Sequence, residues 1–269
     1  MENLLYKALE GVKSNKNYAF ATIIESTPKG TPRKSGAKML VFSDGTSWGT
    51  IGGGRNEKAV IADALKAIAS KKTSLNTYTY FGRQGESVCG GQIKVFIEPF
   101  YPPLKLIICG AGHIALPLSF IAKMSGFKVT VIDNRKAFAN KKRFMHVDHV
   151  IVGPHAKKLK AQDINPNVYI AIVTQGNEFD FECLKAVVNS NAGYIGVISS
   201  KLKKIKFFDR LKKEGVKESA LKRIHIPMGI DVGAQTPEEI AVSVMAEMTA
   251  VKNNDLLGTS KFDIKSASA

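Results

Sequence analysis

The chain has 269 residues, of which 44% are hydrophobic and 23% charged, and its formal net charge is +16. The length favours two domains, and because no apolar run of about 18 residues occurs, we expect a cytoplasmic protein with no membrane span and no signal peptide. Most of the positive charge is lysine spread along the chain, and without a helix-turn-helix, zinc-finger or RNP signature it predicts no nucleic-acid partner.

The first hundred residues alternate between helix and strand signals. Apolar residues between Leu4 and Val12 recur every three or four positions, which predicts an amphipathic helix. Short apolar runs and turn residues then predict strands over residues 19–25, 38–42, 76–81 and 93–100 and a helix over residues 56–69. The sequence therefore predicts a small α+β domain over residues 1–101.

Three prolines, Pro99, Pro102 and Pro103, mark a domain boundary because proline cannot donate a hydrogen bond to a sheet. Beyond them, apolar strands alternate with helical stretches, at residues 104–109, 128–132, 150–152, 168–173 and 194–198. A helix start at Thr236 then predicts a helix to about Val251. The expected fold is α/β: a Rossmann-like doubly wound parallel sheet over residues 104–251, preceded by the α+β domain and followed by an irregular tail over residues 252–269.

A glycine turn, Gly110-Ala111-Gly112, ends the first of these strands and precedes a helix. This context fits the dinucleotide fingerprint, in which glycines let the backbone approach a pyrophosphate at a helix N-terminus. Asp133 ends the next strand, where an acidic residue bonds a ribose hydroxyl, and Arg135 is placed to meet a phosphate. The alternative is a degenerate Rossmann domain that binds nothing.

A second glycine loop, residues 49–54, runs into the helix predicted near Asn56. Its three adjacent glycines, Gly52, Gly53 and Gly54, are costly in backbone entropy, which indicates a close approach to another group. A phosphate or another oxyanion at the helix N-terminus, with Arg55 beside it, is one explanation. A tight turn against the neighbouring domain is the other.

Cys89 is followed by two glycines, Gly90 and Gly91, in a polar loop between two strands. Arg83 in the same loop would lower the pKa of the thiol, and a thiolate suits a soft metal or sulfur chemistry.

The other cysteines and the histidines give no such signal. Cys109 in an apolar strand and Cys183 in a helix are expected to be small core residues, and the odd cysteine count argues against a disulfide framework. The spacing of a polar group near residue 150 matches no metal motif, so we expect structural roles for His146, Asp148, His149 and His155.

The linear order of these pieces resembles the XdhC/CoxI family, the accessory proteins that mature xanthine dehydrogenase and carbon monoxide dehydrogenase. The resemblance covers nearly the whole chain. The matching pieces are Glu25-Ser26-Thr27, Thr31-Pro32-Arg33, residues 36–41, residues 49–54 with Glu57, Cys89-Gly90-Gly91, Glu98-Pro99, residues 110–113, Asp133-Asn134-Arg135, residues 194–196, residues 227–234 and residues 237–241.

The resemblance implies a protein that binds molybdenum cofactor, as molybdopterin or its dinucleotide. The family protects this cofactor during sulfuration, with a cysteine desulfurase-type sulfurtransferase as partner, and hands it to a molybdenum hydroxylase apoenzyme. It implies Cys89 as the metal ligand and glycine loops that hold phosphates near the domain interface, completed between subunits if the protein is a homodimer. The implied cofactor-binding residues are Arg33, Gly52, Gly53, Gly54, Arg55, Cys89, Gly90, Gly91, Gly110, Gly112, His113, Asp133, Arg135 and Asp231.

The chain departs from the family pattern in two loops. Where the family often has a histidine after the fourth Rossmann strand, residues 174–180 read Thr-Gln-Gly-Asn-Glu-Phe-Asp, and the usual Gly-Ser-basic run reads Ser199-Ser200-Lys201. Both loops lie where ligands bind in such sheets, so either the ligand is altered or the site is partly lost. The main alternative function is an NAD(P)-dependent oxidoreductase, and another is a sensor or structural module.

Overall fold

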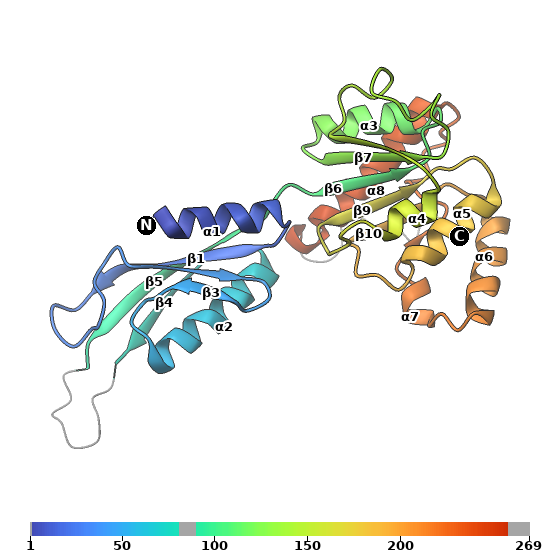
Figure 1. Ribbon diagram of the computed structural model, residues 1–269. Helices are drawn as coiled ribbons and strands as arrows, with labels where there is room; N and C mark the ends of the chain where they lie inside the picture. Colours follow the sequence, from blue (N-terminus) through green and yellow to red (C-terminus); the bar gives the residue numbers. More distant parts are fainter. Residues whose placement is uncertain (1, 81–89, 258–269) are drawn as a thin grey trace. The chain divides into compact units, whose positions relative to one another are not determined.

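The chain forms two compact units that divide between Pro102 and Pro103 (Figure 1). The computed structural model describes residues 2–80 and 90–257. Within these residues, every helix is too short or too polar to cross a membrane.

The N-terminal unit is an α+β domain, as the sequence predicts. Its elements are α1 (Glu2–Lys13), β1 (Tyr18–Ser26), β2 (Lys38–Phe42), β3 (Ser47–Gly49), α2 (Gly54–Ser70), β4 (Ser74–Thr79) and β5 (Gln92–Phe100). The strands form one antiparallel sheet in the order β3-β2-β1-β5-β4. The short strand β3 is absent from the prediction because all of its residues are exposed and carry no apolar pattern.

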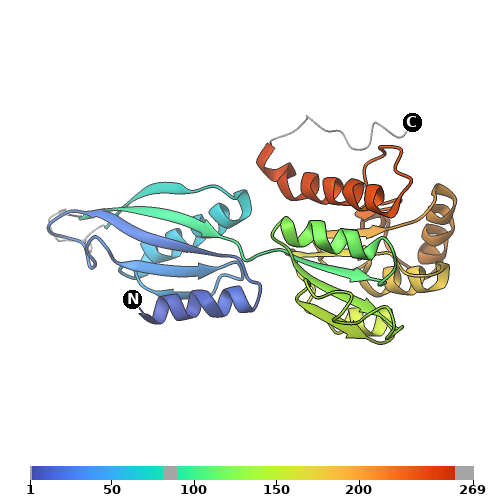
Figure 2. The ribbon, with the colours of Figure 1, turned by 90° about the horizontal axis from the view of Figure 1, so that it is seen from above.

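Successive side chains of β1 lie on alternate faces of the sheet, and both faces are apolar. Ala19, Ala21 and Ile23 are buried in a cluster with residues of α2, whereas Tyr18 and Phe20 belong to an aromatic cluster beneath α1. Successive side chains of a strand point to opposite faces. The sheet is therefore covered by one helix on each side (Figures 1 and 2).

The C-terminal unit is an α/β domain around a six-stranded parallel sheet. Its elements are β6 (Lys105–Cys109), α3 (Ala115–Met124), β7 (Lys128–Asp133), β8 (His149–Val152), α4 (His155–Lys160), β9 (Val168–Ile172), α5 (Asn177–Val187), β10 (Tyr194–Val197), α6 (Lys201–Lys213), α7 (Glu218–Leu221), β11 (Ile224–His225) and α8 (Pro237–Leu257). The strand order is β11-β10-β9-β6-β7-β8, with every neighbouring pair parallel. This is the Rossmann order, so the predicted fold class is confirmed.

Helices cover both faces of this sheet (Figures 1 and 2). Leu106 and Ile108 of β6 are buried in the cluster that contains α3 and α8, whereas Ile107 and Cys109 are buried in the cluster that contains α4, α5 and α6. Because the strands are parallel, the loops that follow β6, β7, β8, β9 and β10 all lie at one edge of the sheet. In such folds ligands bind at this carboxyl edge.

The last helix differs in length from the prediction. It begins as expected, because the Thr236 hydroxyl accepts a hydrogen bond from the Glu239 N–H and the Glu239 carboxylate accepts one from the Thr236 N–H. It then continues to Leu257, so residues 252–257 are helical and do not belong to an irregular tail. The reason is that no glycine or proline follows Pro237 before Gly258 to stop the helix.

Candidate functional site

Three loops that the sequence singles out pack against one another in the N-terminal unit. The Gly91 N–H donates to the Gly30 carbonyl at 3.2 Å, and a Cβ on Gly91 would stand 2.4 Å from the Gly30 carbonyl carbon. A Cβ on Gly52 would stand 2.5 Å from Pro32 and 2.6 Å from the Tyr80 hydroxyl. Both glycines are therefore needed for the close packing of the protein's own loops.

The loop before α2 is held by a carboxylate of the same helix. The Glu57 side chain accepts hydrogen bonds from the Gly53 N–H at 3.1 Å and from the Thr50 hydroxyl. The Gly52 N–H donates in turn to the Thr50 hydroxyl oxygen at 3.0 Å, and the Arg55 side chain is exposed. A phosphate that bound the Gly53 N–H would have to displace Glu57.

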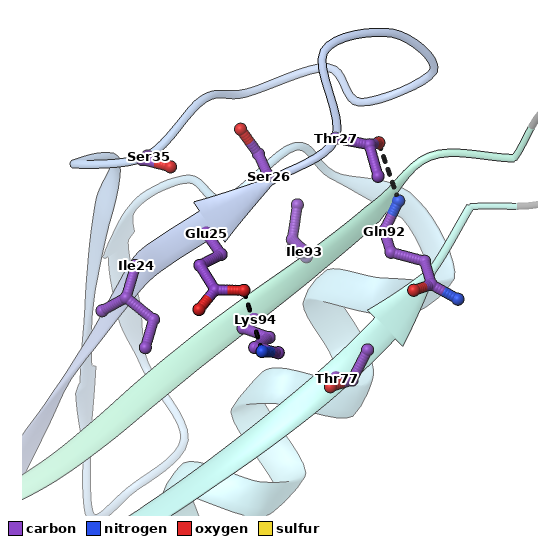
Figure 3. A pocket seen from close by; sticks show the side chains of 9 residues that line it. All are labelled: Ile24, Glu25, Ser26, Thr27, Ser35, Thr77, Gln92, Ile93 and Lys94. Atoms are coloured by element: carbon purple, nitrogen blue, oxygen red, sulfur yellow. Dashed lines mark hydrogen bonds and ion pairs between the residues drawn. The ribbon is translucent and has the colours of Figure 1, made fainter.

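A polar pocket of about 360 Å³ opens on the face of the sheet that carries α1, formed by β1, β4 and β5 (Figure 3). We call it the Glu25 pocket. Its lining residues are Ile24, Glu25, Ser26, Thr27, Ser35, Thr77, Gln92, Ile93 and Lys94. Glu25 and Lys94 form an ion pair of 2.8 Å, and the Gln92 N–H donates to the Thr27 hydroxyl oxygen at 3.0 Å. The pocket thus offers one carboxylate, one ammonium group and several hydroxyl groups.

A β-bulge directs Glu25 into this pocket. Along β1 and β5, Ile23 pairs with Val95 but Glu25 pairs with Lys94, so the register shifts by one residue between the two pairs. Ile23 and Val95 are buried in the cluster with α2, and strict alternation would point Glu25 the same way. The bulge turns Glu25 to the opposite face instead, which no local sequence pattern reveals.

A second pocket of about 270 Å³, the Arg33 pocket, lies next to the glycine loop of residues 49–54. It is lined by Leu4, Arg33, Gly36, Ala37, Lys38 and Thr50. Lys38 donates a hydrogen bond to the Thr22 hydroxyl at 2.9 Å, which fixes its ammonium group. Two cations in one small pocket suit an anionic group such as a phosphate. Of the residues predicted to bind cofactor, Arg33 is the one placed in a described pocket.

In the C-terminal unit, the two glycines of the 110–112 turn have different surroundings. Gly110 has φ +109°, and a Cβ there would stand 2.3 Å from the carbonyl oxygen of Val173. A Cβ on Gly112 would have no atom within 4 Å. Gly110 is therefore required by the fold, and Gly112 leaves open space at the carboxyl edge.

Asp133 is fully buried at the end of β7 and is saturated with hydrogen bonds. It accepts from the Ala111 N–H at 2.7 Å and from three donors of Arg135: the backbone N–H and Nε at 2.9 Å and Nη2 at 2.8 Å. Burial raises the pKa of Asp133, but the bonds and charge of Arg135 outweigh it and lower the pKa to about 2. A carboxylate has about four lone-pair sites, so none is left for a ribose hydroxyl in this conformation.

The loop after β9, where the chain departs from the XdhC/CoxI pattern, is organised by a buried acid. Asp180 is 4% exposed and accepts hydrogen bonds from the Thr174 N–H at 3.2 Å and from the Thr174 hydroxyl. Burial raises the pKa of Asp180 to about 6 despite these bonds. The loop is therefore held by the protein's own carboxylate.

The remaining candidates are dispersed. Cys89, the predicted metal ligand, lies outside the described residues. Cys109 and Cys183 are free and buried, and their mutual hydrogen bond together with burial raises the pKa of Cys109, as expected for inert core thiols. His113 and Asp231 are both exposed.

Two of the polar residues near residue 150, His146 and Asp148, make separate structural contacts. His146 is hydrogen bonded to the Ser119 hydroxyl at 2.8 Å, and Asp148 forms an ion pair of 2.8 Å with Lys123. Among residues 2–80 and 90–257, no three histidine, cysteine, aspartate or glutamate side chains gather as a metal-ligand set.

Each of the two units matches a family model of known proteins. Residues 106–248 match the family model for the XdhC Rossmann domain, and residues 12–80 match that for the XdhC and CoxI family. The chain is 34% identical to "Uncharacterized protein YqeB" of Escherichia coli (strain K12), over 94% of this chain and 47% of that protein. It is 30% identical to a probable xanthine dehydrogenase subunit of Bacillus subtilis (strain 168), over 58% of this chain and 45% of that protein. The chain thus spans about half the length of these relatives.

A solved structure shares the fold. The crystal structure of a xanthine dehydrogenase from Bacillus halodurans matches 95% of this chain and 98% of its own, with a TM-score of 0.53 and 23% identity.

Proposed function

Because the chain belongs to the XdhC and CoxI family, whose Rossmann model matches more than half of its residues, we propose that it is an accessory protein that binds molybdenum cofactor. It protects the cofactor while the terminal sulfur ligand is installed, with a cysteine desulfurase-type sulfurtransferase as partner. It then delivers the cofactor to a xanthine dehydrogenase-type hydroxylase. The name of the Bacillus subtilis relative supports the choice of this partner.

The observation that carries the proposal is the gathering of the family's motifs in the N-terminal unit. The loop that contains Arg33 packs against both Gly52 and Gly91, and it contributes Ser35 to the Glu25 pocket and Arg33 to the Arg33 pocket. Motifs far apart in the sequence therefore pack around one loop, and this loop contributes a residue to each of two pockets. Two such pockets suit a ligand with two chemically different ends.

The donor sets of the two pockets fit the parts of molybdopterin. Arg33 and Lys38 supply positive charge for its phosphate. Glu25 supplies an acceptor for the amino-pyrimidine edge of the pterin, and Lys94 with the nearby hydroxyls supplies donors for its carbonyl. We assign the phosphate to the Arg33 pocket rather than to the N-terminus of α2, because the Glu57 carboxylate accepts from the Gly53 N–H there and would repel a phosphate, whereas the Arg33 pocket offers two cations.

Cys89 is proposed as the metal ligand on its sequence context, because a thiolate binds soft transition metals. When bound, the cofactor supplies the redox-active molybdenum that the hydroxylase needs, and the residues of this chain hold and shield it. NAD-dependent oxidoreduction has less support, because the carboxylate of Asp133, which would bind the free ribose 2′-hydroxyl of NAD, is already saturated by Ala111 and Arg135.

The test is cofactor binding by the whole chain and by matched variants. We expect molybdenum cofactor to co-elute with the protein, and Cys89→Ala and Arg33→Ala to weaken its binding by about tenfold or more. Ser87→Ala and Arg210→Ala, which remove a neighbouring hydroxyl and an unrelated surface cation, serve as controls. Unchanged binding by Cys89→Ala would refute the metal ligand, and hydride transfer to or from NAD(P) would favour the oxidoreductase.

A further inference from the structure

We propose that the C-terminal unit binds a nucleoside phosphorylated on its ribose, with the phosphomonoester held by Arg135 and Arg143 at the carboxyl edge of β7. This inference does not rest on the molybdenum cofactor proposal, which uses residues of the N-terminal unit. The ligand class is that of adenosine 2′-phosphates, and the binding residues come from the glycine turn and the loop after β7.

The guanidinium group of Arg135 is held in a fixed position. Its Nε and Nη2 donate to the buried carboxylate of Asp133, and its Nη1 donates to the side-chain oxygen of Gln175. A guanidinium has five N–H donors, so three are used and two remain. The side chain is 30% exposed, and these two donors are therefore preorganised for an anion from solvent.

A second guanidinium, that of Arg143, contacts the same aromatic ring as Arg135. Both side chains contact the Phe138 ring, whose centroid is 4.1 Å from the Arg135 guanidinium carbon and 5.6 Å from that of Arg143. Arg143 Nη2 is 3.4 Å from the Gly112 carbonyl oxygen, and its Nε is buried without a hydrogen-bond partner among the described residues. The two cations are thus tied to the glycine turn, where Gly112 leaves open space.

The charge of the whole loop favours a phosphate over a neutral ribose. Between Asp133 and Asp148 the chain has no acidic residue, and its basic residues are Arg135, Lys136, Lys141, Lys142 and Arg143. In a Rossmann sheet this loop lies where the ribose of the nucleotide binds, and an arginine here accommodates a 2′-phosphate. The saturated Asp133 leaves no acceptor for a free 2′-hydroxyl.

A buried histidine beside Asp133 has ring nitrogens that a ligand at this edge could use. His155 is 4% exposed, and neither ring nitrogen has a hydrogen-bond partner among the described residues. Its Nε2 faces the Asp133 carboxylate at 3.9 Å, which is too long for a hydrogen bond. Burial lowers the pKa of His155, so the imidazole is neutral near pH 7 and offers one donor and one acceptor. Buried polar groups of native proteins are normally satisfied, and a bound ribose would supply the partner.

The test uses isothermal titration calorimetry of the full chain with adenosine 2′,5′-bisphosphate, 5′-AMP and inorganic phosphate. We expect the bisphosphate to bind about tenfold or more tightly than 5′-AMP or phosphate, a difference of about 1.4 kcal/mol. Arg143→Ala should remove this preference, and Arg210→Ala, which removes an exposed arginine paired with Glu178, should keep it.

Arg135→Ala also leaves Asp133 unpaired, so Arg135→Lys is measured beside it, and both should lose the preference while thermal unfolding confirms a folded protein. Equal affinities for the bisphosphate and 5′-AMP, undetectable binding of all three probes, or a preference that survives Arg143→Ala would each overturn the proposal. Equal binding of inorganic phosphate and the bisphosphate would overturn it as well, because the site would then not recognise a nucleoside.

Discussion

Gly110 lies directly against the carbonyl group of Val173: a Cβ built on Gly110 would stand 2.3 Å from that oxygen. The backbone of Gly110 also has φ +109°, which side chains rarely permit. Gly112 belongs to the same turn but has neither constraint, since no atom lies within 4 Å of its Cβ position. One glycine of the turn therefore serves the fold, and the other leaves room for the approach of a ligand.

Because the two glycines differ in this way, we expect alanine substitutions at Gly110 and Gly112 to lower the free energy of unfolding by different amounts. Gly110→Ala should lower the free energy of unfolding by about 3 kcal/mol, because the new methyl group meets rigid backbone at a positive φ. Gly112→Ala should change it by less than about 1 kcal/mol but weaken nucleotide binding at the carboxyl edge. Urea unfolding of both variants measures the first quantity and calorimetry the second. Equal destabilisation by the two substitutions would contradict this assignment.

Much of the fold is predictable because apolar periodicity is a local property. Strands that are buried on both faces, such as residues 168–172, appear as continuous apolar runs, and the capping pair Thr236 and Glu239 marks the start of α8. By contrast, β3 is exposed and β11 has two residues, so neither has an apolar pattern to detect. The order of the strands follows from the parallel αβ repeat and the glycine turn.

The site is less predictable, because its geometry depends on contacts between distant residues. Arg33, Gly52 and Gly91 can be identified from their motifs, but the position of Glu25 depends on a bulge against β5. The carboxylate of Asp133, which a ribose would use, already accepts hydrogen bonds from Arg135. The sequence spacing of the two residues does not reveal these bonds. Likewise, nothing in the sequence pairs Arg143 with the ring of Phe138.

The Glu25–Lys94 ion pair should matter for binding and not for stability. The two side chains are 62% and 47% exposed, and exposed pairs contribute about 0–1 kcal/mol. We expect Glu25→Gln and Lys94→Met to leave the midpoint of urea unfolding nearly unchanged and to weaken the binding of molybdenum cofactor. Lys66→Met, which removes another exposed lysine paired with an acid, Asp63, is the matched control and should bind normally. Wild-type affinity in both pocket variants would exclude the Glu25 pocket from the site.

Acid should weaken the C-terminal unit through Asp133. Its pKa in the folded state is about 2, below its ordinary value of 3.8, so its contribution to stability is fully present above pH 4 and is lost as the pH falls towards 2. Asp133→Asn should remove about 2 kcal/mol at pH 7 and should flatten the decrease between pH 4 and 2. Urea unfolding at a series of pH values measures both effects, and an Asp133→Asn variant as stable as wild type at pH 7 would refute them.

Asp180 should have the opposite pH dependence. Its pKa is raised from 3.8 to about 6 in the folded protein, so between pH 4 and 6 the folded state holds more protons than the unfolded state, and stability falls as the pH rises through this range. Asp180→Asn keeps an oxygen that accepts from Thr174 but carries no charge to bury. This variant should lose the pH dependence and be at least as stable as wild type at pH 7.5, with a gain of up to about 2 kcal/mol.

The measurement is the difference in the free energy of unfolding between wild type and variant at pH 4, 5, 6 and 7.5, in which the titration of all other groups cancels. A difference that does not change with pH would mean that Asp180 ionises normally and that burial does not control this loop.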